Sequence, residues 1–465
     1  MDQSGRTAAV VARVRRLVHD GTLREGDRLP STRALAAELG VARGTVVAAF
    51  EQLDGEGYIR TRQGAVAVVA ASVTVRADDV VRPAHRVPDG AAADRAAPLD
   101  ARPGLPAVTA IPERDWRGAW RRAADEPLRN TLSDPLGTPV LREQVAASLS
   151  LSRGFAPDPS RIVVAAGTSE ALSLVAEALR AHLGRAPRIA VEDPGYRTGR
   201  RALTSAGADL SPVAVDDDGL DPDALATLER IDAVVVTPTH QYPLGSVMPV
   251  ARRRRLLDHA ARAGVLVVED DYDSEFRHRG APVPALAALD TAGSVLHLGG
   301  FSKTLDPRLR CAYVVLPRPD GTQGAAAEAV VTARRARGPV VAEPVQAAVA
   351  HLVRSGALRR HLGRVRRDYT HRRERIAARA AAEHGLEARA LNGGLHTVVT
   401  WSGPATGRAV AARTAAAGVL VTALDEYDVT PGRSPAGVVL GYGALTLPEL
   451  DRALDTLFAA VHAPD

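Results

Sequence analysis

Lysine is almost absent from this sequence. Of its 59 lysine and arginine residues, only Lys303 is a lysine, so 58 are arginine. Arginine supplies ion pairs and surface charge as well as lysine does, but its guanidinium stays protonated in proteins and cannot act as an amine nucleophile. The single lysine is therefore either a chance survivor or a residue kept for amine chemistry such as Schiff-base formation.

Other scarce features limit the class of protein. The only cysteine, Cys311, excludes an intramolecular disulfide, fits a reducing cytoplasm and is expected in the core. No apolar run approaches the roughly 20 residues that a membrane-spanning helix needs, and the N-terminus lacks the pattern of a signal peptide. Basic and acidic residues nearly balance, 59 against 54, so any nucleic-acid site must be argued from local sequence. Aromatic residues make up only 3%, so each tyrosine position is informative.

The first 70 residues have the pattern of a helix-turn-helix with a wing. Apolar spacing predicts helices at 7–19, 32–39 and 43–55, then strands at 58–60 and 65–69. Ser31 or Thr32 can cap the second helix, and Gly40 makes the tight turn to the third. In such a motif the second helix of the pair enters the major groove of DNA. On periodicity alone, the segment could equally be a small helical cap on a larger domain.

The specific residues of this segment favour a DNA-binding domain. GDRLPSTRALAAELGVARGTVVAAFEQLDGEGYI, residues 26–59, resembles the winged-helix head of the GntR family of bacterial transcription regulators. The resemblance implies that Arg28 and Arg33 hold DNA phosphates and that Arg43 and Thr45 lie on the recognition helix. Phosphate contacts position such a domain, and base contacts specify the sequence. The wing departs from the family pattern, because Gly-Ser-Gly-Thr is replaced here by RQGAVAV.

Residues 71–102 are predicted to form a flexible linker. Alanine, aspartate, arginine and proline dominate this stretch, and no apolar face repeats in it. Such a composition cannot bury enough apolar surface to offset the entropy of the chain. We therefore expect a DNA-binding domain at 1–70, a linker at 71–102 and a second domain at 103–465.

The remaining sequence alternates short apolar runs with helical stretches, which predicts an α/β domain with a largely parallel sheet. The runs are 162–165, 189–191, 233–237, 265–268, 295–299 and 312–316. Ligands of such sheets gather at the carboxyl ends of the strands, so the polar residues that follow each run are candidate site residues. Gly167, Thr168, Ser169 and Glu170 follow the first run and begin a helix, whose free N–H groups could hold a phosphate.

An acidic cluster, Glu269-Asp270-Asp271-Tyr272-Asp273, follows the fourth run. Buried carboxylates are costly unless a cation or a proton shares them. A metal site is one explanation, but no histidine nearby has ligand spacing. A pyridoxal phosphate site explains the set better, because an aspartate pairs with the pyridine nitrogen, a tyrosine meets the ring oxygen and a lysine forms the imine. Lys303 lies one strand-crossover-strand unit beyond Asp270.

Five motifs in order extend the resemblance to nearly the whole chain. GTSEAL, VEDPGY, TPTHQYPLG, VVEDDYDSEF and GGFSKTLDPRLR, within residues 104–462, resemble the fold type I aminotransferase domain of the MocR regulators, a branch of the GntR family. This resemblance implies a smaller C-terminal α+β subdomain, pyridoxal 5'-phosphate as cofactor, and a homodimer. By motif, Lys303 is the imine lysine and catalytic candidate, Asp270 the pyridine partner and Tyr272 the contact to the ring oxygen. The other implied cofactor-binding residues are Tyr196, which stacks on the ring, Gly167, Thr168, Ser302 and Arg310, which hold the phosphate, and His240, which lines the pocket with Gln241.

Three departures from the family pattern affect binding. Gly300 stands where the family commonly has threonine, and Leu132 where a tyrosine usually reaches the partner subunit's phosphate. Each change removes a hydroxyl group. The hydrogen bond of that hydroxyl to a charged phosphate would contribute about 1–3 kcal/mol to the free energy of binding. Val439 stands where aminotransferases carry the arginine that clamps the substrate carboxylate, with Arg433 or Arg197 as potential substitutes.

Three functions are consistent with these observations. The first is a transcription regulator that binds an operator and senses pyridoxal phosphate, or an amine or amino-acid adduct of it. The second is a working aminotransferase with a DNA-binding head, which the missing clamp disfavours because the amino acid would be poorly oriented. The third is a relic without a cofactor, which the retention of Lys303 disfavours. The sequence favours the regulator.

Overall fold

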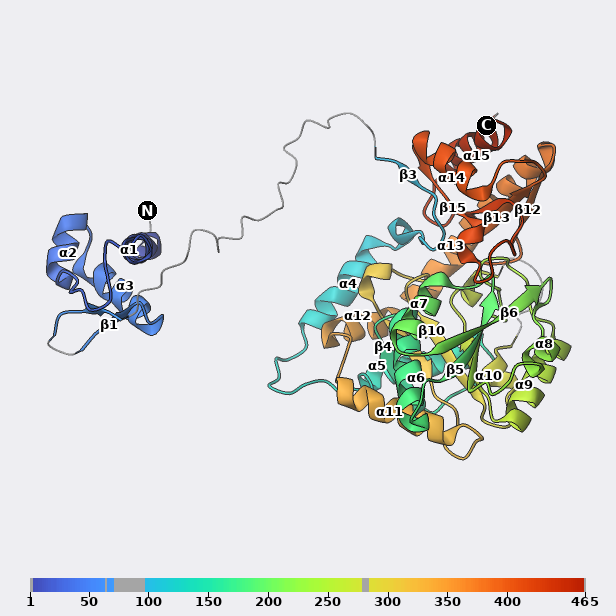
Figure 1. Cartoon of the computed structure of the whole chain (residues 1–465), viewed down its shortest axis with the longest axis horizontal. Coiled ribbons are helices and arrows are strands. Elements are labelled where there is room, and N and C mark those ends of the chain that lie inside the picture. The colour runs from blue at the N-terminus through green and yellow to red at the C-terminus, as the bar shows by residue number, and fades with distance from the viewer. Residues whose placement is uncertain (1–2, 63–64, 71–96, 278–283, 464–465) are drawn as a thin grey trace. The chain divides into compact units, whose positions relative to one another are not determined.

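The computed structural model describes residues 3–62, 65–70, 97–277 and 284–463. The chain divides into two compact units, residues 1–95 and 96–465, which are described separately here (Figure 1). No described helix has both the length and the apolarity needed to cross a membrane.

The first unit is a small three-helix domain with a two-stranded wing. Its elements are α1 Gln3–His19, α2 Thr32–Leu39, α3 Arg43–Gly55, β1 Ile59–Arg60 and β2 Val68–Val69. Ser31 caps α2, because its Oγ accepts from Ala34 N at 3.2 Å, and Gly40 ends the helix at a φ of 63°. Val46, Phe50 and other apolar residues of the three helices pack into one core. The wing strands are shorter than predicted, and Gln63 and Gly64 of its turn lie outside the described residues.

The predicted linker ends earlier than expected. Residues 71–96 lie outside the described residues, whereas β3, Leu99–Asp100, pairs in parallel with β14, Val419–Leu420. Further along, Gly441 N donates to Ala101 O at 2.8 Å, and Ala107 N donates to the Tyr369 hydroxyl at 3.0 Å. Backbone pairing therefore makes residues 97–107 part of the large unit, which corrects the boundary predicted at residue 102. We call residues 97–107 the entry strap.

An eight-stranded sheet forms the centre of the large unit, with the strand order β4-β11-β10-β9-β8-β5-β6-β7. The strands are β4 Ile162–Ala165, β5 Arg188–Asp193, β6 Asp209–Asp216, β7 Gly219–Leu220, β8 Ala233–Val236, β9 Leu266–Asp270, β10 Val295–Gly300 and β11 Ala312–Val315. β5, β6, β8, β9 and β10 pair in parallel, whereas β7 and β11 run antiparallel to their neighbours. The predicted α/β architecture with a largely parallel sheet is confirmed.

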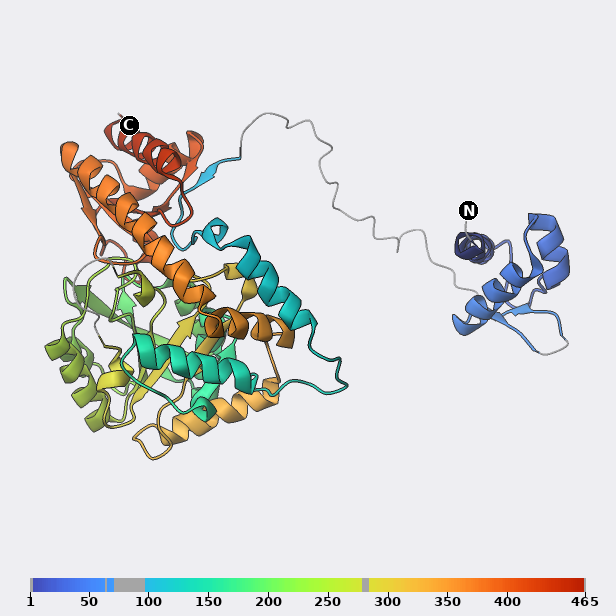
Figure 2. The ribbon, with the colours of Figure 1, turned by 180° about the vertical axis from the view of Figure 1, so that it is seen from behind.

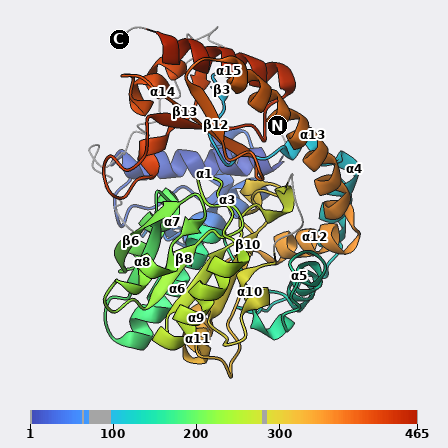
Figure 3. The same ribbon diagram turned by 90° about the vertical axis from the view of Figure 1, so that its right-hand side faces the viewer.

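Helices cover both faces of this sheet, which explains why its strands read as continuous apolar runs. Leu266 and Val268 of β9 join a core with α6, Thr168–Leu183, and α11, Gly324–Arg337. Val267, which points to the opposite face, joins a core with α9, Val250–Ala263. The other helices in this part of the unit are α4 Glu113–Ala124, α5 Pro139–Ser152, α7 Arg197–Ser205, α8 Pro222–Ala226, α10 Leu286–Leu289 and α12 Glu343–Arg354. Figures 2 and 3 show α5 beside α12.

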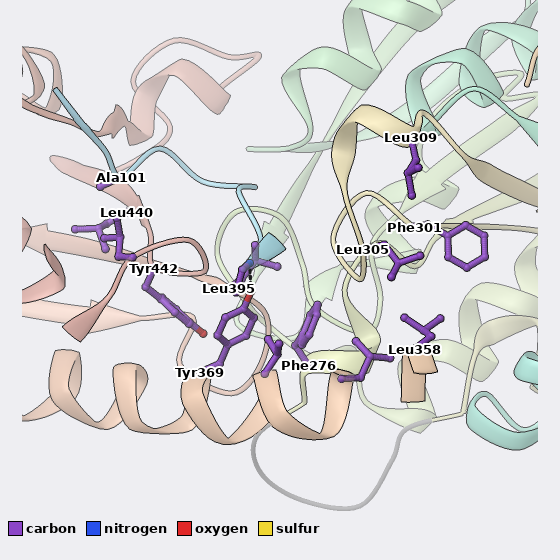
Figure 4. Close-up of a cluster of buried hydrophobic side chains, with 14 of the residues drawn as sticks. Ala101, Phe276, Phe301, Leu305, Leu309, Leu358, Tyr369, Leu395, Leu440 and Tyr442 are labelled. Atoms are coloured by element: carbon purple, nitrogen blue, oxygen red, sulfur yellow. Dashed lines mark hydrogen bonds between the residues drawn. The ribbon is translucent and has the colours of Figure 1, made fainter. Parts of the chain in front are cut away.

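A smaller subdomain follows the long helix α13, Ala357–Ala382. Its four-stranded sheet is antiparallel and has the order β12-β13-β16-β15. The elements are β12 Leu386–Arg389, β13 His396–Trp401, β15 Thr422–Ala423, β16 Gly437–Gly441, α14 Gly407–Ala416 and α15 Leu447–His462. Figure 4 shows a buried cluster along α13 that joins Tyr442 of this subdomain to Phe301 and Leu305, which lie on either side of Lys303 in the sequence.

Candidate functional site

A cavity of about 420 Å³ lies at the carboxyl ends of β9 and β10, as predicted for a sheet of this kind. We call it the Lys303 cavity. The predicted residues on its wall are Thr168, Tyr196, Asp270, Tyr272, Ser302, Lys303 and Arg310. Other wall residues include Asp100, Arg102 and Gly104 of the entry strap, and Tyr242, His396 and Tyr427.

Lys303 lies three residues after the end of β10, where the chain leaves the sheet. Its Nζ donates to Gly104 O at 2.8 Å. Gly104 has a φ of 98°, and a Cβ at that position would lie 2.7 Å from Nζ, so a glycine is needed for this approach. Burial lowers the pKa of Lys303, partly opposed by the charges of Asp273 and Asp270. The lowered pKa increases the fraction of neutral amine, which is the nucleophilic form.

Asp270 is the last residue of β9 and is 5% exposed. Its Oδ1 has no hydrogen-bond partner among the described residues. Burial, together with the neighbouring charge of Asp271, raises the pKa of Asp270 to about 7. A buried carboxyl oxygen without a partner is costly, so this position is suited to a cationic or protonated group of a ligand.

An anion-binding corner forms where α6 begins. The N-cap residue Gly167 makes no side-chain cap, so the first N–H groups of α6 are left to other acceptors. A Cβ at Gly167, whose φ is 98°, would come within 2.7 Å of Arg310 Nη2, so the lack of a side chain there leaves room for the guanidinium at the helix end. Arg310 Nη2 donates to Ala166 O at 2.7 Å, and the hydroxyls of Thr168 and Ser302 lie on the same cavity wall. This set of donors suits a phosphate.

Four tyrosines line the cavity, and sequence reasoning missed two of them. Tyr196, which donates to or accepts from Ser169 Oγ at 3.2 Å, lies edge-on to Tyr242. Tyr242 in turn contacts the rings of Tyr272 and Tyr427, and its hydroxyl donates to that of Tyr427 at 3.2 Å. The scarcity of aromatic residues could have identified Tyr242, which lies inside the motif TPTHQYPLG.

His240 and Gln241 do not lie on the cavity wall, which corrects the predicted position of both. His240 Nδ1 lies 2.9 Å from the Tyr272 hydroxyl and 2.9 Å from Asp273 Oδ2, so this ring supports Tyr272 from behind. Gln241 Nε2 donates to Pro194 O at 2.9 Å. The turn after β8 points both side chains into the protein.

His240, Asp273 and His396 are three buried potential metal ligands close together, an arrangement that linear spacing did not indicate.

The three residues that depart from the family pattern, Gly300, Leu132 and Val439, lie in different parts of the large unit. Gly300 does not line the Lys303 cavity, and Leu132 is 88% exposed on the segment between α4 and α5. Val439 is fully buried in a cluster with Tyr427 and Tyr242 behind the cavity. Of the two potential substitutes for the clamp, Arg197 lines the cavity but pairs with Glu426, and Arg433 donates to Asp193 O away from the wall.

The DNA-binding candidates differ in exposure. Arg28, Arg33 and Arg43 are exposed, and Arg43 Nε donates to Thr32 Oγ1 at 3.5 Å. Thr45 is 2% exposed and faces the core of the small domain, so its side chain does not reach the surface that would meet DNA. The prediction for Thr45 is therefore wrong, because it lies one turn before the buried Ala49 on the same face of α3.

Replacing Asp270 with asparagine should stabilise the ligand-free protein at pH 8. A carboxyl whose pKa rises from 3.8 to about 7 binds its proton more tightly in the folded state. Its contribution to stability is present below pH 4 and is lost as the pH rises through 7. The neutral amide avoids that loss, so we expect a gain of up to about 4 kcal/mol at pH 8 and little change at pH 4, measured by chemical unfolding. Asp320→Asn, at an exposed site, should leave stability unchanged; equal gains in both variants would contradict the assignment.

Both units match known families. Residues 6–69 match the bacterial regulatory proteins of the gntR family, and residues 107–457 match aminotransferase class I and II. The solved structure of LysN, an α-aminoadipate aminotransferase from Thermus thermophilus, matches with a TM-score of 0.69 and 24% identity over 78% of this chain and 92% of that chain. An archaeal alanine:glyoxylate aminotransferase matches with a TM-score of 0.71 and 21% identity over 78% of this chain and 90% of that chain. These structures establish the fold of the large unit.

Two transcriptional regulators align over most of this chain. The HTH-type pyridoxine biosynthesis transcriptional regulator PdxR of Corynebacterium glutamicum is 37% identical over 93% of this chain and 90% of its own length. The probable rhizopine catabolism regulatory protein MocR of Rhizobium meliloti is 35% identical over 77% of this chain and 73% of its own length. Because both units match these families and the two regulators align at 35% identity or more, the chain belongs to the MocR-type regulators of the GntR family, and it is a helix-turn-helix transcriptional regulator with an aminotransferase-like domain.

Proposed function

We propose that this regulator binds pyridoxal 5'-phosphate in the Lys303 cavity and that its occupancy controls DNA binding. The observation that carries the proposal is the arrangement around the only lysine, where an amine of lowered pKa, an unpartnered buried carboxylate and an anion-binding corner line one cavity. Domains of aminotransferase class I and II typically bind this cofactor.

The residues present fit the cofactor group by group. Arg310, Ser302, Thr168 and the N–H groups that follow Gly167 would hold the phosphate. Asp270 would pair with the pyridine nitrogen, Tyr272 would meet the ring oxygen, and Tyr196 would lie against the ring. When bound, the cofactor supplies an aldehyde that condenses with an amine. Lys303 is the only side-chain amine in the chain that can take this part.

The cavity favours sensing over rapid amino-group transfer. Among the described residues of its wall, no arginine is left for a substrate carboxylate except Arg310, because Arg102 pairs with Asp100 and Arg197 pairs with Glu426. Arg310 belongs to the anion-binding corner, which would hold the phosphate of the cofactor. Val439, which replaces the clamp, is an apolar residue buried behind two tyrosines. The effector is therefore the cofactor itself or an amine that needs no carboxylate clamp.

We further propose that the protein acts as a homodimer in the cytoplasm, and that the two winged-helix domains of the dimer bind one operator. Leu128 and Leu132 are 103% and 88% exposed on the segment that precedes α5, and a second copy would cover them. In each head, Arg28, Arg33 and Arg43 present exposed cations to DNA. Cofactor binding can shift the arrangement of two heads only by its differential affinity for the two arrangements.

The test is to measure DNA binding and cofactor binding in one preparation. Adding pyridoxal phosphate should produce a visible absorption band and change the affinity for DNA fragments selected in vitro on the full-length protein. Amino-group transfer from a panel of amino acids should be slow in the same preparation. A visible band without any change in DNA affinity would refute the regulatory link, and rapid turnover without specific DNA binding would reverse the assignment in favour of an aminotransferase.

A further inference from the structure

A second cavity, of about 830 Å³, lies behind the segment that carries Lys303. Its wall is built from α5, the start of α13, the turn at Ser274–Phe276 and the end of β10. Ser302 and Lys303 line the first cavity, whereas Phe301 and Thr304 line this one. Figure 4 shows Phe301 and Leu358 of this wall beside Leu305. We call it the Thr304 cavity.

Positive charge dominates the wall of the Thr304 cavity. Five arginines line it, against one carboxylate, that of Glu275; the arginines are Arg153, Arg277, Arg354, Arg359 and Arg366. Arg354 and Arg359 are exposed at the junction of α12 and α13, and neither side chain has an ion pair or a hydrogen bond within the described part of the chain. Two cations at the rim of a concave, partly apolar site focus the field on its interior and favour an anionic ligand.

A buried hydroxyl at the same wall also lacks a partner. Thr304 is 2% exposed, and its Oγ1 has no hydrogen-bond partner among the described residues. An unsatisfied buried hydroxyl costs free energy unless a ligand or a water completes it. Around it, Phe301, Leu358 and Leu362 supply apolar surface. The wall therefore offers one hydroxyl, several guanidinium groups and an apolar floor.

We propose that the Thr304 cavity binds a small organic anion, a phosphate or carboxylate attached to an apolar body. The anionic group lies near Arg354 and Arg359, and the apolar body packs on Phe301 and Leu358. Because Thr304 and Lys303 are consecutive residues, a ligand here contacts the reverse side of the cofactor-binding segment. This is a site separate from the Lys303 cavity, and its existence does not depend on cofactor binding.

The fluorescent probe 8-anilinonaphthalene-1-sulfonate, which joins a sulfonate to an aromatic body, tests the site on the full-length protein. We expect saturable binding in the parent that is about tenfold weaker in the Arg354→Ala/Arg359→Ala double variant, since two charge-assisted contacts are lost. Ser148→Phe, which places a ring into the cavity from α5, should abolish the same signal. Arg367→Ala removes an exposed arginine of α13 that does not line the cavity, and should bind the probe as the parent does.

Displacement identifies the class of anion. Phenyl phosphate and benzoate carry the same ring with different anionic groups, and preferential displacement of the probe by either one supports the site and assigns its chemistry. Unchanged probe affinity in both the double arginine variant and Ser148→Phe would overturn the proposal. Both arginines are exposed, so the double variant is expected to fold even if Ser148→Phe does not. Thermal unfolding of each variant checks this point.

Discussion

Lys303→Ala is expected to abolish completely the visible absorption that the parent protein gains with pyridoxal phosphate. No other lysine exists in the chain to replace it, and the 58 arginines cannot, because a guanidinium stays protonated. The anion-binding corner remains intact in the variant, so weak noncovalent binding of pyridoxal phosphate should persist. Lys303→Arg, which keeps the positive charge, should be equally devoid of the band.

The pH dependence of this binding gives a second readout for Lys303. The neutral amine is the reactive form, so covalent capture should strengthen as the pH rises through the lysine pKa. Because burial lowers that pKa, the rise should occur below the pH at which an exposed lysine, with a pKa of 10.5, would show it. Borohydride reduction followed by mass spectrometry would locate the modified residue. A visible band retained in the alanine variant, or a modification elsewhere, would contradict the assignment.

Arg153→Met is expected to destabilise the large unit by about 3–5 kcal/mol, as found when one partner of a buried ion pair is removed. Arg153 Nε lies 2.6 Å from Asp271 Oδ2, with the two side chains 6% and 4% exposed, and its Nη2 donates to Thr239 Oγ1 at 2.9 Å. The variant leaves the Asp271 carboxylate buried with a hydrogen bond from Ser274 Oγ but without its cation.

Chemical unfolding measures this loss, and two further variants separate its causes. Adding Asp271→Asn to Arg153→Met should recover part of the stability, because the uncompensated charge is removed. Arg375→Met breaks an exposed pair with Asp451 and should cost less than about 1 kcal/mol. Equal losses in Arg153→Met and Arg375→Met would show that the buried pair has no special role.

Residues that follow strands were predictable from the sequence, because strand ends fix them at one edge of the sheet. Asp270 ends β9, Tyr272 lies two residues beyond it and Lys303 lies three residues after β10, and the structure brings all three to one cavity. His240 also follows a strand, four residues after the end of β8, but the turn there directs its ring behind Tyr272. Proximity in sequence to a strand end therefore predicts which edge of the sheet a residue reaches, but not the direction in which its side chain points.

The contribution of the entry strap could not be predicted, because its composition matches that of a linker. Gly104 and Asp100 reach the Lys303 cavity through pairing with β14, more than 300 residues away in sequence, and no local pattern indicates such a contact. The burial of Thr45 was predictable in principle. Its spacing of four from Ala49 places it on the apolar face of α3, although its position in the reader head suggested DNA contact.

The hydrogen bond from Lys303 Nζ to Gly104 O joins the only lysine of the chain to the entry strap, the segment with which the described part of the large unit begins. If the Lys303 amine condensed with the cofactor aldehyde as proposed, Nζ would have fewer N–H donors than the three of a free ammonium, and the entry strap uses one of them. The anchoring of the entry strap on the large unit would then depend in part on the bonding state of a single nitrogen atom.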